Sequence, residues 1–180
     1  MSDSGRTADD ELSEFGIATV GEIDSELVKK VRLGSLDVLQ RLIRQTKLKW
    51  NSDCDAVVRD FETRLKPNLI TLRAKTCQNR RFVYFHEYPT SSTIYRPEHG
   101  TGKHTVVIVI RDGPGLPLIC KGSHKSDELD LSTFDPPSTI SSGEGSVVVF
   151  DSGIVRKDTL VQVASWVGIL LVYGESNTGS

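Results

Sequence analysis

After Pro67 the chain divides into short segments rich in β-branched and aromatic residues, and clusters of Gly, Pro, Ser and Asp separate them. Such segments are typical of strands bounded by turns. Eight strands are expected, at residues 81–88, 92–96, 104–111, 116–121, 131–134, 146–150, 160–163 and 165–173. Residues 104–110 and 166–172 are almost continuously apolar, which is typical of central strands covered on both faces. Eight short strands at this spacing predict an all-β sandwich or barrel.

The residues before Pro67 have a different pattern. Residues 1–21 contain few apolar side chains and are expected to form a flexible tail. Apolar residues recur at helical spacing over residues 24–50, which predicts either one helix or two helices divided at Gly34-Ser35. A further helix is expected to begin at Ser52, whose hydroxyl caps the amide of Asp55, and to end before Pro67. The sequence therefore predicts one domain over residues 22–180, with helices at about 24–66 and a barrel at about 69–174.

Composition excludes several classes of function. The 180 residues carry 22 basic and 24 acidic side chains, a formal charge of -2 that favours neither nucleic acid nor an anionic membrane as partner. No apolar run approaches the roughly 20 residues that span a bilayer, and the first residues have no signal-peptide pattern. Three cysteines far apart indicate no disulfide framework. An intracellular protein is expected, most simply a cytoplasmic one, although a nuclear location is also compatible with the sequence.

Three local patterns resemble a known family. Residues 121–125, Lys-Gly-Ser-His-Lys, follow an apolar strand. Residues 145–156 combine a glycine turn, a β-branched strand and an Asp-Ser-Gly corner, and residues 104–116 form a strand, a Gly-Pro-Gly turn and the start of another strand. Together they are similar to the iron(II)/2-oxoglutarate-dependent oxygenases, especially the phytanoyl-CoA dioxygenase-like branch, and residues 145–160 also fit the spacing of the second cupin motif. The resemblance covers about residues 81–174. It implies a mainly β fold, a double-stranded β-helix (jelly roll) buttressed by two or three N-terminal α-helices.

The resemblance also implies a metal centre, and here the sequence departs from the family. The family holds iron(II) with a His-x-Asp/Glu pair and a distal histidine. In this chain His99 is followed two residues later by Thr101, which offers a hydroxyl, and His104 is likewise not followed by an acid. The distal position is Arg156, a permanent cation that cannot coordinate a metal. Residues 165–166, Ser-Trp, stand where a basic residue normally binds the cosubstrate carboxylate. The resemblance therefore implies a degenerate iron site.

The candidate site residues follow from this comparison. His99 and His104 are the candidate catalytic residues and the candidate metal ligands, because imidazoles beside a glycine-rich bend can bind a metal, contact a substrate or transfer a proton. Arg96, Thr101 and Arg156 are the candidate substrate-binding residues. Arg156 has two interpretations: it binds a carboxylate or phosphate inside the barrel, or it fills the former metal cavity and pairs with Asp151 or Asp158.

Three functions remain open on these grounds. The first is an oxygenase that uses Fe(II) and 2-oxoglutarate on a small organic metabolite. The second is a protein without a metal or other cofactor that keeps the barrel as a pocket and acts as an isomerase, a cyclase or a ligand-binding protein. The third is a non-catalytic protein that binds another protein. The fold alone does not choose among them, because function depends on the site.

Overall fold

The computed structural model describes residues 5–41, 50–84, 94–95, 100–112, 118–127, 138–139, 143–157 and 167–175. Its strands form a five-stranded sheet in the order β1-β7-β4-β9-β2 and a four-stranded sheet in the order β3-β8-β5-β6. The strands are β1 Ile17–Glu22, β2 Thr76–Tyr84, β3 Ile94–Tyr95, β4 His104–Arg111, β5 Leu118–Cys120, β6 Ser138–Thr139, β7 Ser146–Asp151, β8 Val155–Lys157 and β9 Val167–Gly174. Every described strand pair is antiparallel, and from β2 onward the chain passes repeatedly between the two sheets. This is the predicted double-stranded β-helix.

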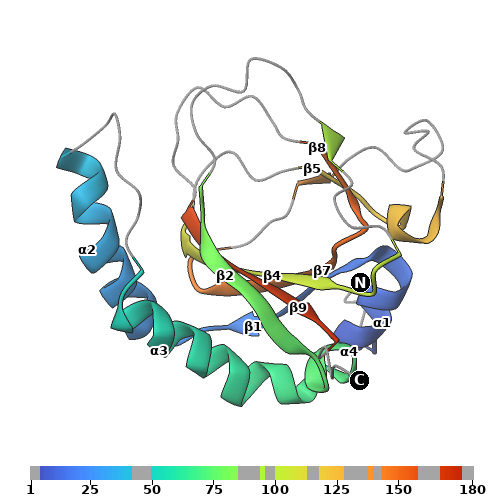
Figure 1. The fold of residues 1–180 in the computed structure, drawn as a ribbon, viewed down its shortest axis with the longest axis horizontal. Helices are drawn as coiled ribbons and strands as arrows, with labels where there is room; N and C mark the ends of the chain where they lie inside the picture. The colour runs from blue at the N-terminus through green and yellow to red at the C-terminus, as the bar shows by residue number, and fades with distance from the viewer. Residues whose placement is uncertain are drawn as a thin grey trace, which may run out of the picture.

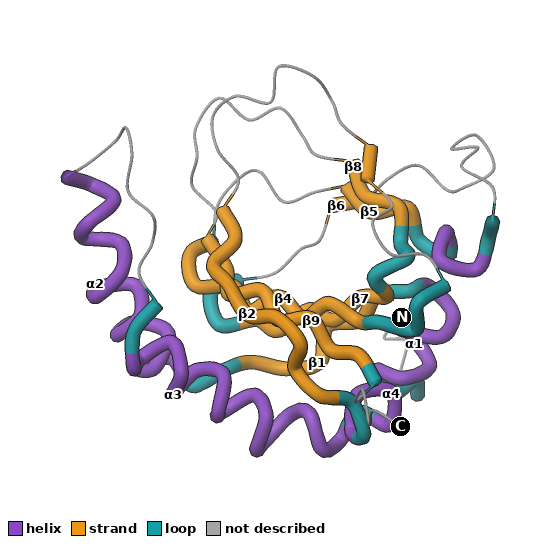
Figure 2. The backbone as a smooth tube through the Cα atoms, viewed as in Figure 1, coloured by secondary structure: helices purple, strands orange, loops and turns teal. Residues whose placement is uncertain are grey.

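The helices are α1 Ala8–Phe15, α2 Ser25–Arg41, α3 Ser52–Asp60 and α4 Ile70–Arg73, and a π-helical turn, Phe61–Leu65, continues α3. They pack on the face of the large sheet that points away from the small sheet (Figures 1 and 2). The predicted helical buttress is therefore confirmed. Among the described residues, no helix has both the length and the apolarity that crossing a bilayer requires.

The N-terminal residues do not form the expected flexible tail. Thr7 and Asp10 form a capping box at the start of α1, and β1 pairs with β7 from Ile17↔Phe150 to Glu22↔Ser146. The carboxylate of Asp9 accepts hydrogen bonds from the backbone amides at the start of α4, residues 70 and 71, both at 2.9 Å. The prediction was wrong because edge strand β1 obtains its stability from pairing and burial against the rest of the sheet, which low local hydrophobicity does not reveal.

The structure decides two further details of the helices. Helix α2 continues through Gly34 and Ser35, so the glycine costs helix stability without ending the helix. Asn51, rather than Ser52, caps α3: its side-chain oxygen accepts from the amides of Asp53 and Cys54, both at 3.1 Å. The capping residue of α3 thus lies one position earlier than predicted.

The large sheet has two buried faces, as its apolar central strands predict. Alternate residues of β4 point to opposite sides of the sheet. Val106, Ile108 and Ile110 pack in a cluster with the helices, whereas Val107 and Val109 pack in a second cluster with residues of the small sheet and its connections. The first face is called the helix face and the second the barrel interior. The interior cluster contains Val107, Val109, Ile119, Val148, Phe150, Ile154 and Leu170.

Candidate functional site

The corner between β7 and β8, residues 151–155, is held by hydrogen bonds along its whole backbone. Each of its five successive backbone N–H groups donates a hydrogen bond, and three of the acceptors come from distant segments of the chain. The bonds are Asp151 N to Gly16 O (2.9 Å), Ser152 N to Lys103 O (3.0 Å), Gly153 N to Asp151 Oδ1 (2.7 Å), Ile154 N to Asp151 O (3.0 Å) and Val155 N to Ser123 Oγ (2.8 Å). The corner therefore fixes the backbone that leads directly into position 156.

The register of β8 assigns a face to position 156. Arg156 is paired with Ile119 of β5 and with Tyr95 of β3. Directly paired residues lie on the same face of a sheet, and the Ile119 side chain belongs to the interior cluster. Ile154, two residues before Arg156, belongs to the same cluster. Both relations assign position 156 to the barrel interior by backbone geometry.

Two hydroxyl side chains lie on the interior face beside this corner. Thr105, one residue into β4, has the same strand parity as Val107, and its Oγ1 is 2.9 Å from Oγ of Ser152. Both residues are buried. Neither was a candidate in the sequence, because a threonine in a strand and a serine in a turn carry no distinctive signal. Only the alternation of β4, together with the known position of the helices, shows that Thr105 faces inward.

His104 lies at the same end of the sheet as the corner but on the helix face, in parity with Val106. Its side chain is buried, with Nδ1 3.0 Å from Nζ of Lys75 and Nε2 4.0 Å from Oδ2 of Asp151. The Lys75 ammonium also donates to the carbonyl of Gly102. Since an ammonium can only donate, Nδ1 of His104 accepts and its proton resides on Nε2. His104 thus ties the start of β4 to the segment between α4 and β2.

Burial lowers the pKa of His104, the Lys75 ammonium lowers it further, and Asp151 partly opposes both effects. The unfolded chain, with a histidine near its ordinary value of 6.5, therefore takes up this proton at higher pH than the folded protein does. It follows that the contribution of neutral His104 to stability is present above about pH 6.5 and is lost as the pH falls through the lower folded pKa.

Replacing Lys75 with glutamine is expected to raise the pKa of His104 toward its ordinary value, because the substitution removes a cation 3.0 Å from Nδ1. Titration of the His104 ring protons by NMR measures this shift directly. The loss of stability on acidification should become smaller in the variant. Lys103→Gln is the matched control, since it removes a lysine from the adjoining loop that is not among the groups acting on His104. An unchanged His104 titration in Lys75→Gln would contradict the assignment.

Of the predicted site residues, the structure describes Thr101, His104 and the backbone of Arg156, and it does not bring these three into one group. His104 and position 156 belong to opposite faces of the barrel wall. Thr101 is exposed in the turn between Gly100 and Gly102, where its Oγ1 accepts from the amide of Lys103 at 3.4 Å. His99 and Arg96 lie outside the described residues, as do residues 165–166. The assignments of His99 and His104 as catalytic residues and metal ligands stay predictions.

The donor set of the described residues does not fit a non-heme iron centre. Such a centre needs two imidazoles and a carboxylate on one side of the metal. Within the described ranges, no group of three His, Cys, Asp or Glu side chains is placed to hold a metal ion. Nδ1 of His104 already faces an ammonium, and Arg156 has no lone pair to offer.

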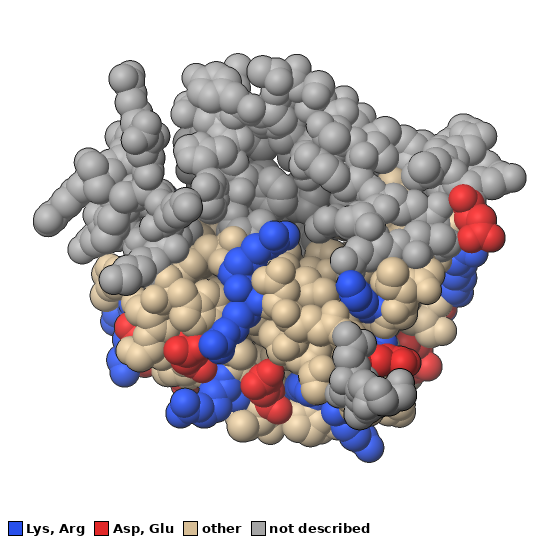
Figure 3. All heavy atoms as spheres, in the orientation of Figure 1, with Lys and Arg blue, Asp and Glu red and all other residues tan. Residues whose placement is uncertain are grey.

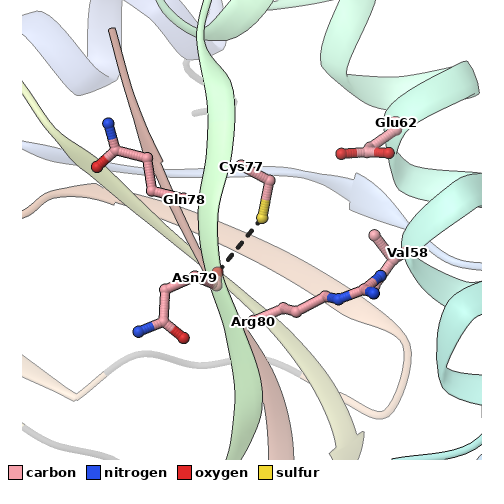
Figure 4. Close-up of a pocket in the computed structure, with 6 residues that line it drawn as sticks. All are labelled: Val58, Glu62, Cys77, Gln78, Asn79 and Arg80. Atoms are coloured by element: carbon pink, nitrogen blue, oxygen red, sulfur yellow. Dashed lines mark hydrogen bonds between the residues drawn. The ribbon is translucent and has the colours of Figure 1, made fainter. Parts of the chain in front are cut away.

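A surface pocket of about 320 Å³ lies elsewhere, between α3 with its π-helical turn and the edge strand β2. Figure 4 shows its lining residues Val58, Glu62, Cys77, Gln78, Asn79 and Arg80. Burial, together with Glu62, raises the pKa of the Cys77 thiol, which donates to the carbonyl of Asn79 at 3.3 Å. The thiol is therefore a poor nucleophile.

On the face seen in Figure 3, the described basic and acidic side chains lie beside one another. Arg80 contacts Asp55 at 3.0 Å, and Arg32 contacts Glu144 at 2.7 Å. Exposed pairs of this kind contribute little to stability. This mixture of charges agrees with the near-neutral composition of the chain.

Comparison with solved structures supports the fold class, a helix-buttressed double-stranded β-helix. The chain is similar to AviO1 from Streptomyces viridochromogenes Tue57, at 15% identity and a TM-score of 0.75, over 96% of each chain. It is similar to the non-heme alpha ketoglutarate dependent carbocyclase SnoK from nogalamycin biosynthesis (14% identity, TM-score 0.70, 97% of this chain and 85% of that one). It is also similar to EctD from S. alaskensis with bound Fe (14% identity, TM-score 0.65, 97% and 79%).

No protein-family model and no curated protein sequence matches the chain. At identities this low the similarity establishes the fold, and the structures that share it include non-heme iron and 2-oxoglutarate-dependent enzymes.

Proposed function

We propose that this chain is a member of the iron/2-oxoglutarate oxygenase fold group with a degenerate metal site, and that it binds a small carboxylate-bearing metabolite in the barrel through Arg156. The observation that carries the proposal is the pairing of Arg156 with Ile119, an interior residue. A cation in the position that the family resemblance gives to a metal ligand suits an anion and repels a metal ion. Similarity to structures described as alpha ketoglutarate dependent supports a carboxylate as the ligand class.

The chemistry of such a site follows from its surroundings. A guanidinium presents two parallel N–H groups that match the two oxygens of a carboxylate, and this pairing is stronger where water is excluded. The wall on which position 156 lies carries apolar side chains such as Ile119 and Ile154, both fully buried. The hydroxyl groups of Thr105 and Ser152 lie at the same end of the interior. One of their two O–H groups donates within the pair, and the other is the further hydrogen-bond donor proposed for a bound acid.

Replacing Arg156 with alanine is expected to weaken binding of 2-oxoglutarate or succinate about 10- to 100-fold, because one charge-assisted bidentate contact is lost. The measurement is ligand-dependent thermal stabilisation followed by calorimetric titration. Arg156→Lys should bind with intermediate affinity, since it keeps the positive charge but lacks the two parallel N–H groups of the guanidinium.

Lys157→Ala is the matched control, because strand alternation assigns residue 157 to the opposite face of β8. Equal affinity in Arg156→Ala and the native protein would contradict the proposal. Metal analysis of anaerobically purified protein provides the second test: stoichiometric iron together with 2-oxoglutarate turnover would favour an active oxygenase instead.

A further inference from the structure

We propose that Ser123 is a positioning residue for Arg156, and that the N-terminal helix acts on the site through it. The inference rests on the proposed function, because it concerns the backbone that carries the same guanidinium. Ser123 lies in the short 3-10 turn Ser123–Lys125 after β5, and its side chain is fully buried. Its Oγ accepts a hydrogen bond of 2.8 Å from the backbone amide of Val155, the first residue of β8.

This bond extends a strand ladder that otherwise ends. Strand β5 pairs with β8 from Leu118↔Lys157 to Cys120↔Val155, and the chain then turns away at Gly122, which has a φ of 79°. The serine hydroxyl therefore accepts the hydrogen bond that a backbone carbonyl would accept if the ladder continued. Arg156 is the next residue along β8, so a displacement of the Val155 backbone also displaces Arg156.

The turn that carries Ser123 is itself held by the N-terminal segment. The amide of Gly122 donates to the carbonyl of Phe15 at 2.8 Å, and Nε2 of His124 lies 3.3 Å from the carbonyl of Ser13. Asp151, at the other end of the corner, donates to Gly16 of the same segment. The junction of α1 and β1 thus supports both approaches to position 156.

The first test follows the backbone and needs no ligand. In Ser123→Ala, the Val155 amide loses its side-chain acceptor, and amide hydrogen exchange is expected to be at least about tenfold faster at residues 155–157. Exchange in β4 should stay unchanged. Ser146→Ala is the control, because Ser146 is also buried but starts β7, at the end opposite the corner. Unchanged protection at residues 155–157 would overturn the inference.

The second test is a double-mutant cycle on 2-oxoglutarate affinity. Ser123→Ala should weaken binding about five- to tenfold in the native background and have no effect in an Arg156→Ala background, because positioning matters only while the guanidinium is present. A general loss of stability would act in both backgrounds. An equal effect in both, or none in either while Arg156→Ala alone weakens binding, would overturn the positioning role and leave the proposed function intact. Full affinity in Arg156→Ala would contradict the proposed function itself, and the exchange experiment would still decide the role of Ser123.

Discussion

Replacing Phe61 with alanine is expected to lower the free energy of unfolding by about 3–5 kcal/mol, the usual cost of removing a fully buried phenylalanine ring. Phe61 begins the π-helical turn after α3, and none of its surface is exposed. Its ring packs against Tyr173 of β9, with the centroids 6.0 Å apart. The hydroxyl of Tyr173 donates to Glu62 at 2.9 Å, so the ring contact and this bond attach the helical layer to the same residue of the sheet.

Chemical denaturation followed by circular dichroism measures this effect. Phe61→Leu should retain most of the stability because it keeps most of the buried volume. Leu33→Ala is the control for removing an apolar side chain from a helix where it is 56% exposed, and its effect should be small. A cost below about 1 kcal/mol for Phe61→Ala would mean that the helices do not depend on this contact.

The same variant separates the two faces of the large sheet. Phe61 belongs to the helix-face cluster, whereas the proposed ligand site lies in the barrel interior. Under conditions in which the Phe61→Ala variant is still fully folded, it should therefore bind 2-oxoglutarate with nearly native affinity. Stability and binding are thus expected to respond to different sets of buried residues.

The strands that could be predicted from the sequence are those whose own residues form a clear β-branched, apolar pattern. Strand β4 has the predicted bounds, 104–111, and β7 differs from prediction by one residue. Both are β-branched runs that are apolar on both faces, so no information from distant residues is needed. Strand β8 was not predicted, because three residues, Val155–Lys157, carry too short a pattern.

The site depends on information of a different kind. Alternation along β4 predicts that His104 and Thr105 face opposite ways, but it does not say which of them faces inward. That depends on which side of the sheet the helices cover, a property of packing between distant segments. Likewise, the face of position 156 follows from its pairing with Ile119, 37 residues earlier in the chain. The Ser123–Val155 bond joins residues 32 apart and has no local signal at all.

The contact between the N-terminal segment and the Gly-Ser-His turn, residues 122–124, depends on Gly16. Gly16 ends α1 in the left-handed region, with a φ of 74°, and a Cβ added there would lie 2.4 Å from Nδ1 and 2.8 Å from Cγ of His124. Because Cγ is close to the root of the side chain, a simple rotation of the ring tip does not relieve the clash. The ring would have to leave the carbonyl of Ser13.

Gly16→Ala is therefore expected to cost about 3 kcal/mol, since left-handed strain and overpacking each contribute about 1–3 kcal/mol. Gly100→Ala separates the two contributions: its φ is 73°, and an added Cβ would meet nothing within 4 Å, so that variant reports strain alone. Denaturation of both variants gives the cost of displacing His124 as their difference. If the Gly-Ser-His turn supports β8, Gly16→Ala should also accelerate amide exchange at residues 155–157, whereas Gly100→Ala should not. Equal stability of the two variants would mean that His124 moves away from the new methyl group at no cost in free energy. In that case the contact with α1 does not hold the turn in place.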